Sequence, residues 1–170
     1  ALLRQAVTIA DAELRARFGE PRVAGPEGPR RCRFVVLGLG KLGGRELNFS
    51  SDIDLMFVYE DEGETTGAGR PGEAPAGVVT NDEYFRRLGE TLSKAVGELT
   101  AEGHMFRVDL RLRPEGRSGP VAASMPRCAF YYASYRQTWE RLALIKVRPV
   151  AGDLDLGEAF LGLVAPFAYS

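Results

Sequence analysis

The sequence is poor in the residues that build disulfide frameworks and zinc sites. Among its 170 residues are two cysteines, Cys32 and Cys128, and a single histidine. Two cysteines so far apart predict reduced thiols in a cytoplasmic protein rather than a secreted disulfide scaffold. No apolar run approaches the ~20 residues of a membrane span, and the first residues lack the pattern of a signal peptide. We therefore expect no membrane segment, and the helix-like start of the chain indicates a domain of a larger protein.

An excess of basic charge is also missing. The 22 lysines and arginines are balanced by 23 aspartates and glutamates, which gives a net charge of −1. A protein that binds nucleic acid without sequence preference needs basic side chains to neutralise phosphates, so we expect no nucleic-acid partner. Hydrophobic residues make up 45% of the chain, which is enough for a packed core and argues against general disorder.

Apolar periodicity outlines the expected secondary structure. Strands are expected at 33–37, 52–59 and 106–113, and helices at 2–18, 45–48, 81–99, 130–147 and 157–164. Thr80 and Glu83 have the spacing of a capping box, and Ser124 can cap the helical region that follows it. Two stretches rich in glycine and proline, 20–31 and 60–79, are expected to be a connector and a mobile surface loop.

Two acidic residues mark the start of the second expected strand. Residues two apart on a strand face the same side, so Asp52 and Asp54 present two carboxylates together. Neighbouring carboxylates repel each other and are costly to desolvate, so the pair needs a compensating cation. Mg²⁺ fits this requirement because hard ions take carboxylate oxygen. A solvated strand face is the plain alternative for an Asp-x-Asp pair.

A third acidic residue, Asp109, lies on the charged face of the strand expected at 106–113. If that strand neighbours the first pair, three carboxylates can hold two metal ions roughly 3.5–4 Å apart, as in nucleotidyl transfer. Arg111 and Arg113 share the face of Asp109 and could neutralise phosphates, or could form the wet face of an edge strand. Lys146 and Arg148 could likewise line a phosphate pocket or coat a helix end.

A glycine-rich turn precedes the acidic pair. Its Gly43-Gly44 step would let backbone N–H groups approach a phosphate closely, with Ser51 nearby. The same segment also matches the dinucleotide fingerprint G-x-G-x-x-G over 38–43, with Glu60 about 20 residues on. Only residues 42–50 are available for a crossover helix, whereas a βαβ unit takes ~30 residues, so we disfavour that interpretation.

Three long motifs resemble one enzyme family. Residues 38–55, 107–120 and 137–153 are similar to the bifunctional glutamine synthetase adenylyltransferase/adenylyl-removing enzymes. The resemblance covers nearly the whole chain from about residue 33. It implies an α+β fold of the DNA polymerase β-like nucleotidyltransferase type, with a mixed sheet and flanking helices. The expected division is a helical leader at 1–22, a nucleotidyltransferase core at 31–122 and a helical extension at 123–170.

The resemblance also implies a site and a reaction. The metal-binding carboxylates of the family fall on Asp52, Asp54 and Asp109, which would hold two Mg²⁺ ions. The expected phosphate- and nucleotide-binding residues are Gly43, Gly44, Ser51, Arg111 and Arg113. Family members attach AMP from ATP to a tyrosine of glutamine synthetase, or remove it with inorganic phosphate to give ADP. They respond to a PII-type nitrogen sensor.

The amino-acid sequence of the motifs favours the adenylyl-removing half of the family. The segment 48–54 and the stretch 113–120 are closer to that half than to the adenylyl-attaching one. Attachment of AMP from ATP is the first alternative, since both halves share their chemistry. A non-catalytic regulatory or partner-binding module is the second alternative, from another class of function.

Overall fold

The computed structural model describes residues 2–43, 52–101, 108–135 and 137–169. Its helices are α1 (Leu2–Phe18), α2 (Gly40–Gly43), α3 (Asn81–Ala101), α4 (Met125–Ser134), α5 (Thr138–Ile145) and α6 (Leu154–Ala168), with a 3-10 turn at Gly116–Ser118. Its strands are β1 (Arg22–Val23), β2 (Arg30–Arg31), β3 (Phe34–Leu39), β4 (Ile53–Tyr59), β5 (Val108–Asp109), β6 (Ala122–Ser124) and β7 (Arg148–Gly152).

A five-stranded mixed sheet forms the centre of the fold. Its order is β5-β4-β3-β7, with β6 also paired to β4. β3 runs antiparallel to both β4 and β7, whereas β5 and β6 run parallel to β4. The expected α+β class is confirmed. The antiparallel pairing of β3 and β4 also excludes a dinucleotide-type βαβ unit at the glycine-rich turn, as the short crossover indicated.

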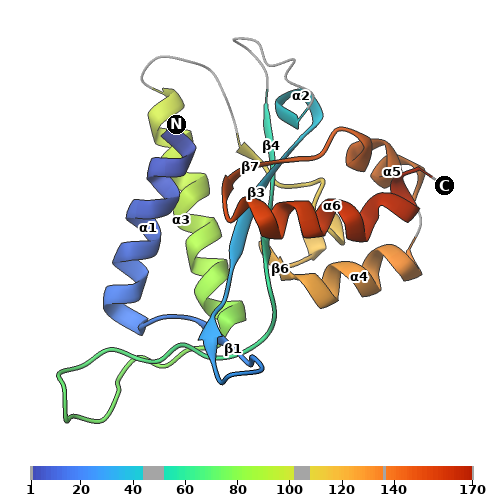
Figure 1. Cartoon of the computed structure of the whole chain (residues 1–170). Coiled ribbons are helices and arrows are strands. Elements are labelled where there is room, and N and C mark those ends of the chain that lie inside the picture. Colours follow the sequence, from blue (N-terminus) through green and yellow to red (C-terminus); the bar gives the residue numbers. More distant parts are fainter. Residues whose placement is uncertain (1, 44–51, 102–107, 136, 170) are drawn as a thin grey trace.

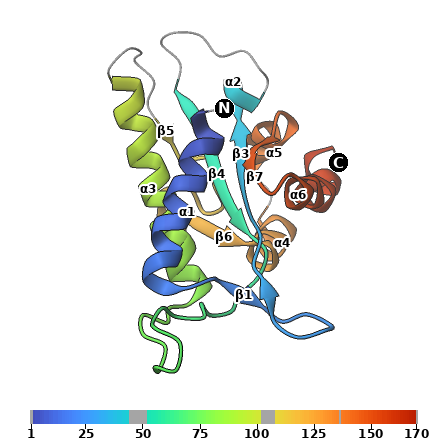
Figure 2. The same cartoon turned by 60° about the vertical axis from the view of Figure 1, so that its left-hand side comes forward.

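Helices cover both faces of the sheet. α1 and α3 lie on one face, and α4, α5 and α6 lie on the other (Figures 1 and 2). Successive side chains of a strand point to opposite faces, so Phe57 packs with α1 and α3 while Val58 packs with the second group. Both are completely buried, and burial of a large apolar side chain contributes roughly 1.5–3 kcal/mol. Hydrophobic packing on both faces therefore fixes the position of β4.

Local signals in the sequence place the helices well. α1 begins and ends where periodicity predicts, and the expected helix at 157–164 lies inside α6. The hydroxyl of Thr80 accepts a hydrogen bond from the backbone N–H of Glu83 at 3.1 Å. The hydroxyl of Ser124 accepts one from the N–H of Arg127 at 3.2 Å. Both expected caps are confirmed, and each satisfies a backbone donor that the first helical turn leaves unpaired.

Three expectations about the second half of the chain are wrong or incomplete. Of the strand expected at 106–113, residues 106–107 lie outside the described residues, and the rest is a strand only at 108–109. A turn follows, in which the N–H of Arg113 donates to the carbonyl of Leu110 at 3.3 Å. The single helix expected over 130–147 is two helices, α4 and α5, since the chain is extended at Tyr135 and Gln137. Strands β6 and β7 were not anticipated. The short helix expected at 45–48 lies outside the described residues.

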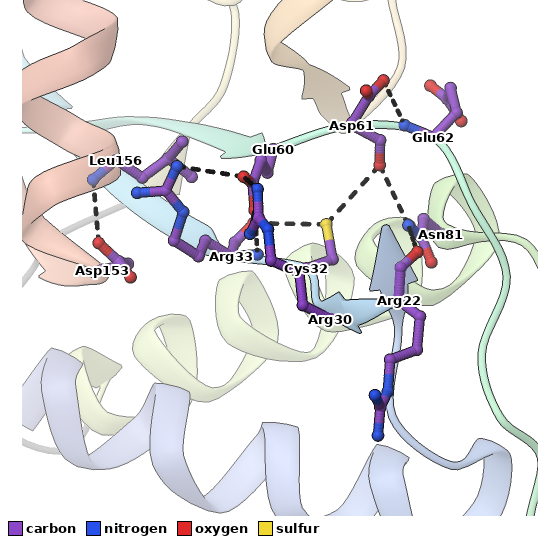
Figure 3. Close-up of polar contacts among 10 residues, drawn as sticks. All are labelled: Arg22, Arg30, Cys32, Arg33, Glu60, Asp61, Glu62, Asn81, Asp153 and Leu156. Atoms are coloured by element: carbon purple, nitrogen blue, oxygen red, sulfur yellow. Dashed lines mark hydrogen bonds and ion pairs between the residues drawn. The ribbon is translucent and has the colours of Figure 1, made fainter. Parts of the chain in front are cut away.

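The sheet has two distinct ends. α2 and the start of β4 lie at one end, and β1 and the segment 60–79 lie at the other (Figure 1). At the second end Glu60, directly after β4, receives hydrogen bonds from Arg30 and Arg33 (Figure 3). Burial acts to raise the pKa of this carboxyl, but the two arginines outweigh it and lower the pKa to about 2. Glu60 is therefore a firmly ionised structural anchor.

Both cysteines are buried and unpaired. Burial raises the pKa of Cys32 to about 11 and that of Cys128 to about 12. Thiols with such values carry almost no thiolate at neutral pH and are poor nucleophiles. This agrees with the expectation of two reduced thiols. Among the helices that the structure describes, none is long and apolar enough to cross a membrane.

Candidate functional site

The sheet brings two of the three expected carboxylates together. Asp54 on β4 is the register partner of Asp109 on β5, in the parallel pair of strands. Register partners on neighbouring strands lie about 4.8 Å apart, and their side chains share a face. That face is the one covered by α4, α5 and α6, because Met56 and Val58, two and four residues on, belong to its hydrophobic cluster. Residues 55 positions apart in the chain thus become neighbours.

An open groove lies beside this pair. It has a volume of about 500 Å³ and is lined by Asp52, Val108, Asp109, Leu110, Arg111 and Arg117. Asp52 precedes β4 and is exposed, so it faces the groove from the strand's start. The lining therefore brings Asp52 and Asp109 together with two arginines, while Asp54 is not among the lining residues. Arg117 was not expected from the sequence, since it comes from the 3-10 turn rather than from a strand face.

Asp54 is short of positive charge. It is half-buried, and that burial raises its pKa to about 6, assisted by the charges of Asp109 and Asp52 and opposed by Arg111. A carboxyl in this setting is stabilised by any cation that approaches its oxygens. Asp54 therefore has the electrostatic property expected of a carboxylate that binds a cation.

Asp109 has a different environment. Its carboxylate accepts hydrogen bonds from Nε of Arg111 at 2.9 Å and from Nη2 at 2.6 Å. These bonds hold the pKa of Asp109 below its usual range. Arg111 thus supplies positive charge directly beside Asp109. Within the described ranges, no three Asp, Glu, His or Cys side chains are gathered closely enough to form a finished metal cage.

The donor set nevertheless fits a hard divalent ion. Carboxylate oxygens are the ligands that Mg²⁺ prefers, and it usually binds proteins through one or two of them. Asp54 gains from a nearby cation, and the exposed Arg111 can move away from Asp109 without disturbing buried structure. Occupancy of the site by metal stays a prediction, as does the number of ions.

Arg113 supports the turn after β5. Its guanidinium donates to the backbone carbonyls of Leu110 at 2.8 Å, Gly119 at 3.2 Å and Arg117 at 3.4 Å. Burial lowers the pKa of this guanidinium, yet the three carbonyls satisfy most of its donors. The alternation that placed Arg113 on the face of Asp109 does not apply, because the strand ends first. A contact between Arg113 and phosphate remains a prediction.

The glycine-rich turn packs closely on the site. Gly40 has φ +54°, and a Cβ there would lie 2.5 Å from a carboxylate oxygen of Asp54. A Cβ at Gly43 would lie 2.1 Å from the carbonyl oxygen of Lys146. Only glycine fits at either position. Gly44 and Ser51, expected to contact phosphate, lie outside the described residues.

Comparisons with known proteins match the chain to one group of enzymes. Residues 1–163 match the family described as "Glutamate-ammonia ligase adenylyltransferase". The chain is 48% identical over 165 residues to a protein of Thioalkalivibrio sulfidiphilus named "Bifunctional glutamine synthetase adenylyltransferase/adenylyl-removing enzyme", covering 97% of the chain and 16% of that protein. It is 50% identical over 136 residues to a protein of the same name from Nitrosococcus oceani, covering 80% of the chain and 13% of that protein. The chain thus spans about one sixth of the length of such relatives.

Proposed function

The chain belongs to the glutamate-ammonia ligase adenylyltransferase family, and from this premise we propose that it is a nucleotidyltransferase domain that removes AMP from adenylylated glutamine synthetase. The observation that carries the proposal is the pairing of Asp54 with Asp109 beside an open, arginine-lined groove. The residues of segments 48–54 and 113–120 favour removal of AMP over its attachment. The larger protein would be cytoplasmic and would respond to a PII-type sensor.

Asp52, Asp54 and Asp109 would hold two Mg²⁺ ions. When bound, such ions activate an attacking oxygen and stabilise the leaving oxygen of an in-line displacement. The chain's own contribution would be to hold Asp54 and Asp109 as register partners, with Asp52 directly before β4. Arg111 would leave Asp109 as the ions bind, and its guanidinium would then be available to a phosphate in the same groove.

The reaction would proceed by direct transfer. An oxygen of inorganic phosphate forms a bond to the phosphorus of the adenylyl group, and the bond from that phosphorus to the tyrosine oxygen breaks. The products are ADP and the free tyrosine. Gly43, Gly44 and Ser51 would hold the attacking phosphate, while Arg111 or Arg113 would neutralise charge on the transferring group. Positioning and charge do most of this work, since phosphoryl chemistry asks for little covalent help.

The open groove suits a protein substrate. Its lining residues come from the start of β4, from β5 and from the turn that follows β5. A tyrosine projecting from a folded partner needs an open approach of this kind, whereas a small metabolite is normally enclosed by most of its binding pocket. This feature favours transfer on a protein side chain over transfer between free nucleotides.

A paired assay tests the proposal. The protein that carries this chain is given adenylylated glutamine synthetase with inorganic phosphate in one reaction, and unmodified glutamine synthetase with labelled ATP in the other. We expect Mg²⁺-dependent release of ADP in the first reaction. Asp109→Asn should remove it, because the variant loses a metal-binding carboxylate. Labelling in the second reaction alone would assign the attaching direction instead. Absence of both activities, together with no Mg²⁺-dependent nucleotide binding, would favour a non-catalytic module.

A further inference from the structure

The turn after β3 is held between two neighbours. On one side Gly40 lies against the carboxylate of Asp54. On the other side Gly43 lies against the backbone at Lys146, whose carbonyl oxygen takes the space that a side chain would need. Gly43 is itself buried. The turn therefore cannot shift toward either neighbour without a clash.

The side chain of Arg148 joins this turn to the far edge strand of the sheet. Arg148 is the first residue of β7 and the register partner of Gly38 on β3. Its Nε donates to the carbonyl oxygen of Gly43 at 3.1 Å, in a partly buried position. The bond crosses from β7 to the last residue of α2, which no strand ladder includes. It thus restrains a part of the chain that the sheet alone leaves unpaired.

The backbone that carries Arg148 is itself well fixed. It follows α5 directly, and the buried Leu144 of α5 accepts a hydrogen bond at its carbonyl from the N–H of Val147 at 3.3 Å. The carboxylate of Glu140, at the start of α5, is 3% exposed and accepts a hydrogen bond from the hydroxyl of Tyr131 on α4. The backbone that leads to Arg148 is therefore held in place by α5 and its contacts with α4.

We infer that Arg148 is a positioning residue, which sets the Gly43 turn relative to Asp54 by donating Nε to the Gly43 carbonyl. The inference rests on the proposed function, in which this turn holds the attacking phosphate. It gives Arg148 a role different from both roles considered from the sequence. Arginine suits the task because its planar group donates in a fixed direction, whereas the ammonium of lysine is a mobile point charge.

The role predicts a separation between phosphate binding and chemistry. Asp54 and Asp109 are held by the pairing of β4 and β5, whereas Arg148 lies on β7, which pairs with β3. Loss of the Arg148 bond should therefore loosen the turn and weaken the binding of phosphate, while the carboxylates keep their places. The expected change is a higher KM for inorganic phosphate with little change in kcat.

The first experiment compares three variants in the protein that carries this chain. Arg148→Gln and Arg148→Lys should each raise the KM for inorganic phosphate about five- to tenfold, the effect of one lost hydrogen bond, with kcat within about twofold. Arg22→Gln is the matched control, because Arg22 also donates to a backbone carbonyl, that of Pro29 at 3.3 Å, but at the opposite end of the sheet. It should leave both constants unchanged.

The two Arg148 variants separate positioning from simple charge. A normal KM in Arg148→Lys beside a raised KM in Arg148→Gln would show that the charge matters and would overturn the inference. An unchanged KM in both variants would overturn it as well. Lack of phosphorolysis by the unaltered protein would instead count against the proposed function, and calorimetric binding of inorganic phosphate in the presence of Mg²⁺ then tests Arg148 without turnover.

A substitution at Gly43 tests the same turn independently of Arg148. Gly43→Ala forces the turn away from the carbonyl of Lys146 and should raise the KM for phosphate in the same way. Because both substitutions displace one turn, the double variant with Arg148→Gln should be no worse than the more severe single variant. Multiplicative effects of the two substitutions would contradict a shared mechanism.

Discussion

One strand carries two acidic residues with opposite electrostatic settings. Asp54 near the start of β4 is surrounded by other carboxylates, and burial with their charges raises its pKa to about 6. Glu60 just after the strand's end has two arginines, which overcome its burial and lower its pKa to about 2. The two residues are six positions apart, Asp54 near the start of β4 and Glu60 directly after its end. The candidate site is left short of positive charge, whereas the carboxylate of Glu60 has two arginine partners.

The comparison separates stability from function along a single strand. Charge at the Glu60 end favours the folded state, because its ionised form is better stabilised there than in the unfolded chain. Without a bound cation, the ionised Asp54 carboxylate destabilises the folded state. Proteins commonly accept such a local cost at functional sites. Three substitutions and one change of pH test this difference between the two ends of β4.

The largest effect is expected at the acidic end. Asp54→Asn should lower turnover by about 1,000-fold, since charge at the reacting centre supplies most of the catalysis. The same substitution should raise the metal-free stability by about 1 kcal/mol, once solvent screening of a half-exposed group is allowed for. Calorimetric melting with and without Mg²⁺, beside the turnover assay, measures both. A variant that is inactive and also less stable would mean that Asp54 has a structural role.

Glu60→Gln should show the reverse pattern. Its amide cannot hold Arg30 and Arg33 as a carboxylate does, so the free energy of unfolding should fall by about 2 kcal/mol, as for loss of charge-assisted hydrogen bonds. Turnover should stay within about twofold because the site is at the other end of β4. Urea unfolding at pH 7 measures the first quantity. Stability equal to that of the unaltered chain would show that the pair contributes nothing.

The two carboxyls should give stability pH dependences of opposite sign. Glu60, whose pKa falls from 4.5 to about 2 on folding, stabilises above pH 4.5 and loses this effect as the pH falls toward 2. Asp54, whose pKa rises from 3.8 to about 6, costs nothing below pH 3.8 and costs most above pH 6. Metal-free stability should thus decline by about 1 kcal/mol from Asp54 between those values. The decline should vanish in Asp54→Asn and persist in Glu60→Gln.

The smallest effect is expected at Thr80, which belongs to neither the Asp54 end nor the Glu60 end of β4. Thr80→Ala removes the cap of α3 and should cost about 0.5–1 kcal/mol. Its hydroxyl is uncharged, so the loss should be the same at pH 5 and pH 8, and turnover should not change. Thr80→Ser is the matched control because it retains the capping oxygen. A pH-dependent loss would mean that the cap is coupled to the charged ends of β4.

Much of the fold follows from local signals in the sequence. The boundaries of α1, β3, β4 and α3 are close to those expected, because regular periodicity and capping residues act within each element. β7 was missed because Pro149 argues against a central strand. It is accommodated at the sheet edge beside a register shift between Val36 and Leu37. This segment becomes a strand because it pairs with β3, whereas its own sequence gives little strand signal.

The candidate site was partly predictable for the same reason. The spacing of Asp52 and Asp54 predicted two carboxylates on one side of a strand, but β4 begins at Ile53, so Asp52 lies directly before it. The pairing of Asp54 with Asp109 needed only that the two strands be neighbours. The roles of the arginines could not be read from alternation, since β5 ends at Asp109 and the chain then turns. Gly40, which accommodates the Asp54 carboxylate, was hidden among similar glycines. Its contact depends on tertiary packing.

The path of the chain between the two central carboxylates has a practical consequence. Asp54 precedes the segment 60–79 and Asp109 follows it, while that segment lies at the end of the sheet away from α2 and the start of β4 (Figure 1). A chain divided within it would leave one carboxylate on each piece, so neither piece alone could complete the site. Reassembly of the pieces along β4 would restore both partners at once. The domain could therefore serve as a split reporter, in which recovered turnover measures how tightly two fused proteins associate.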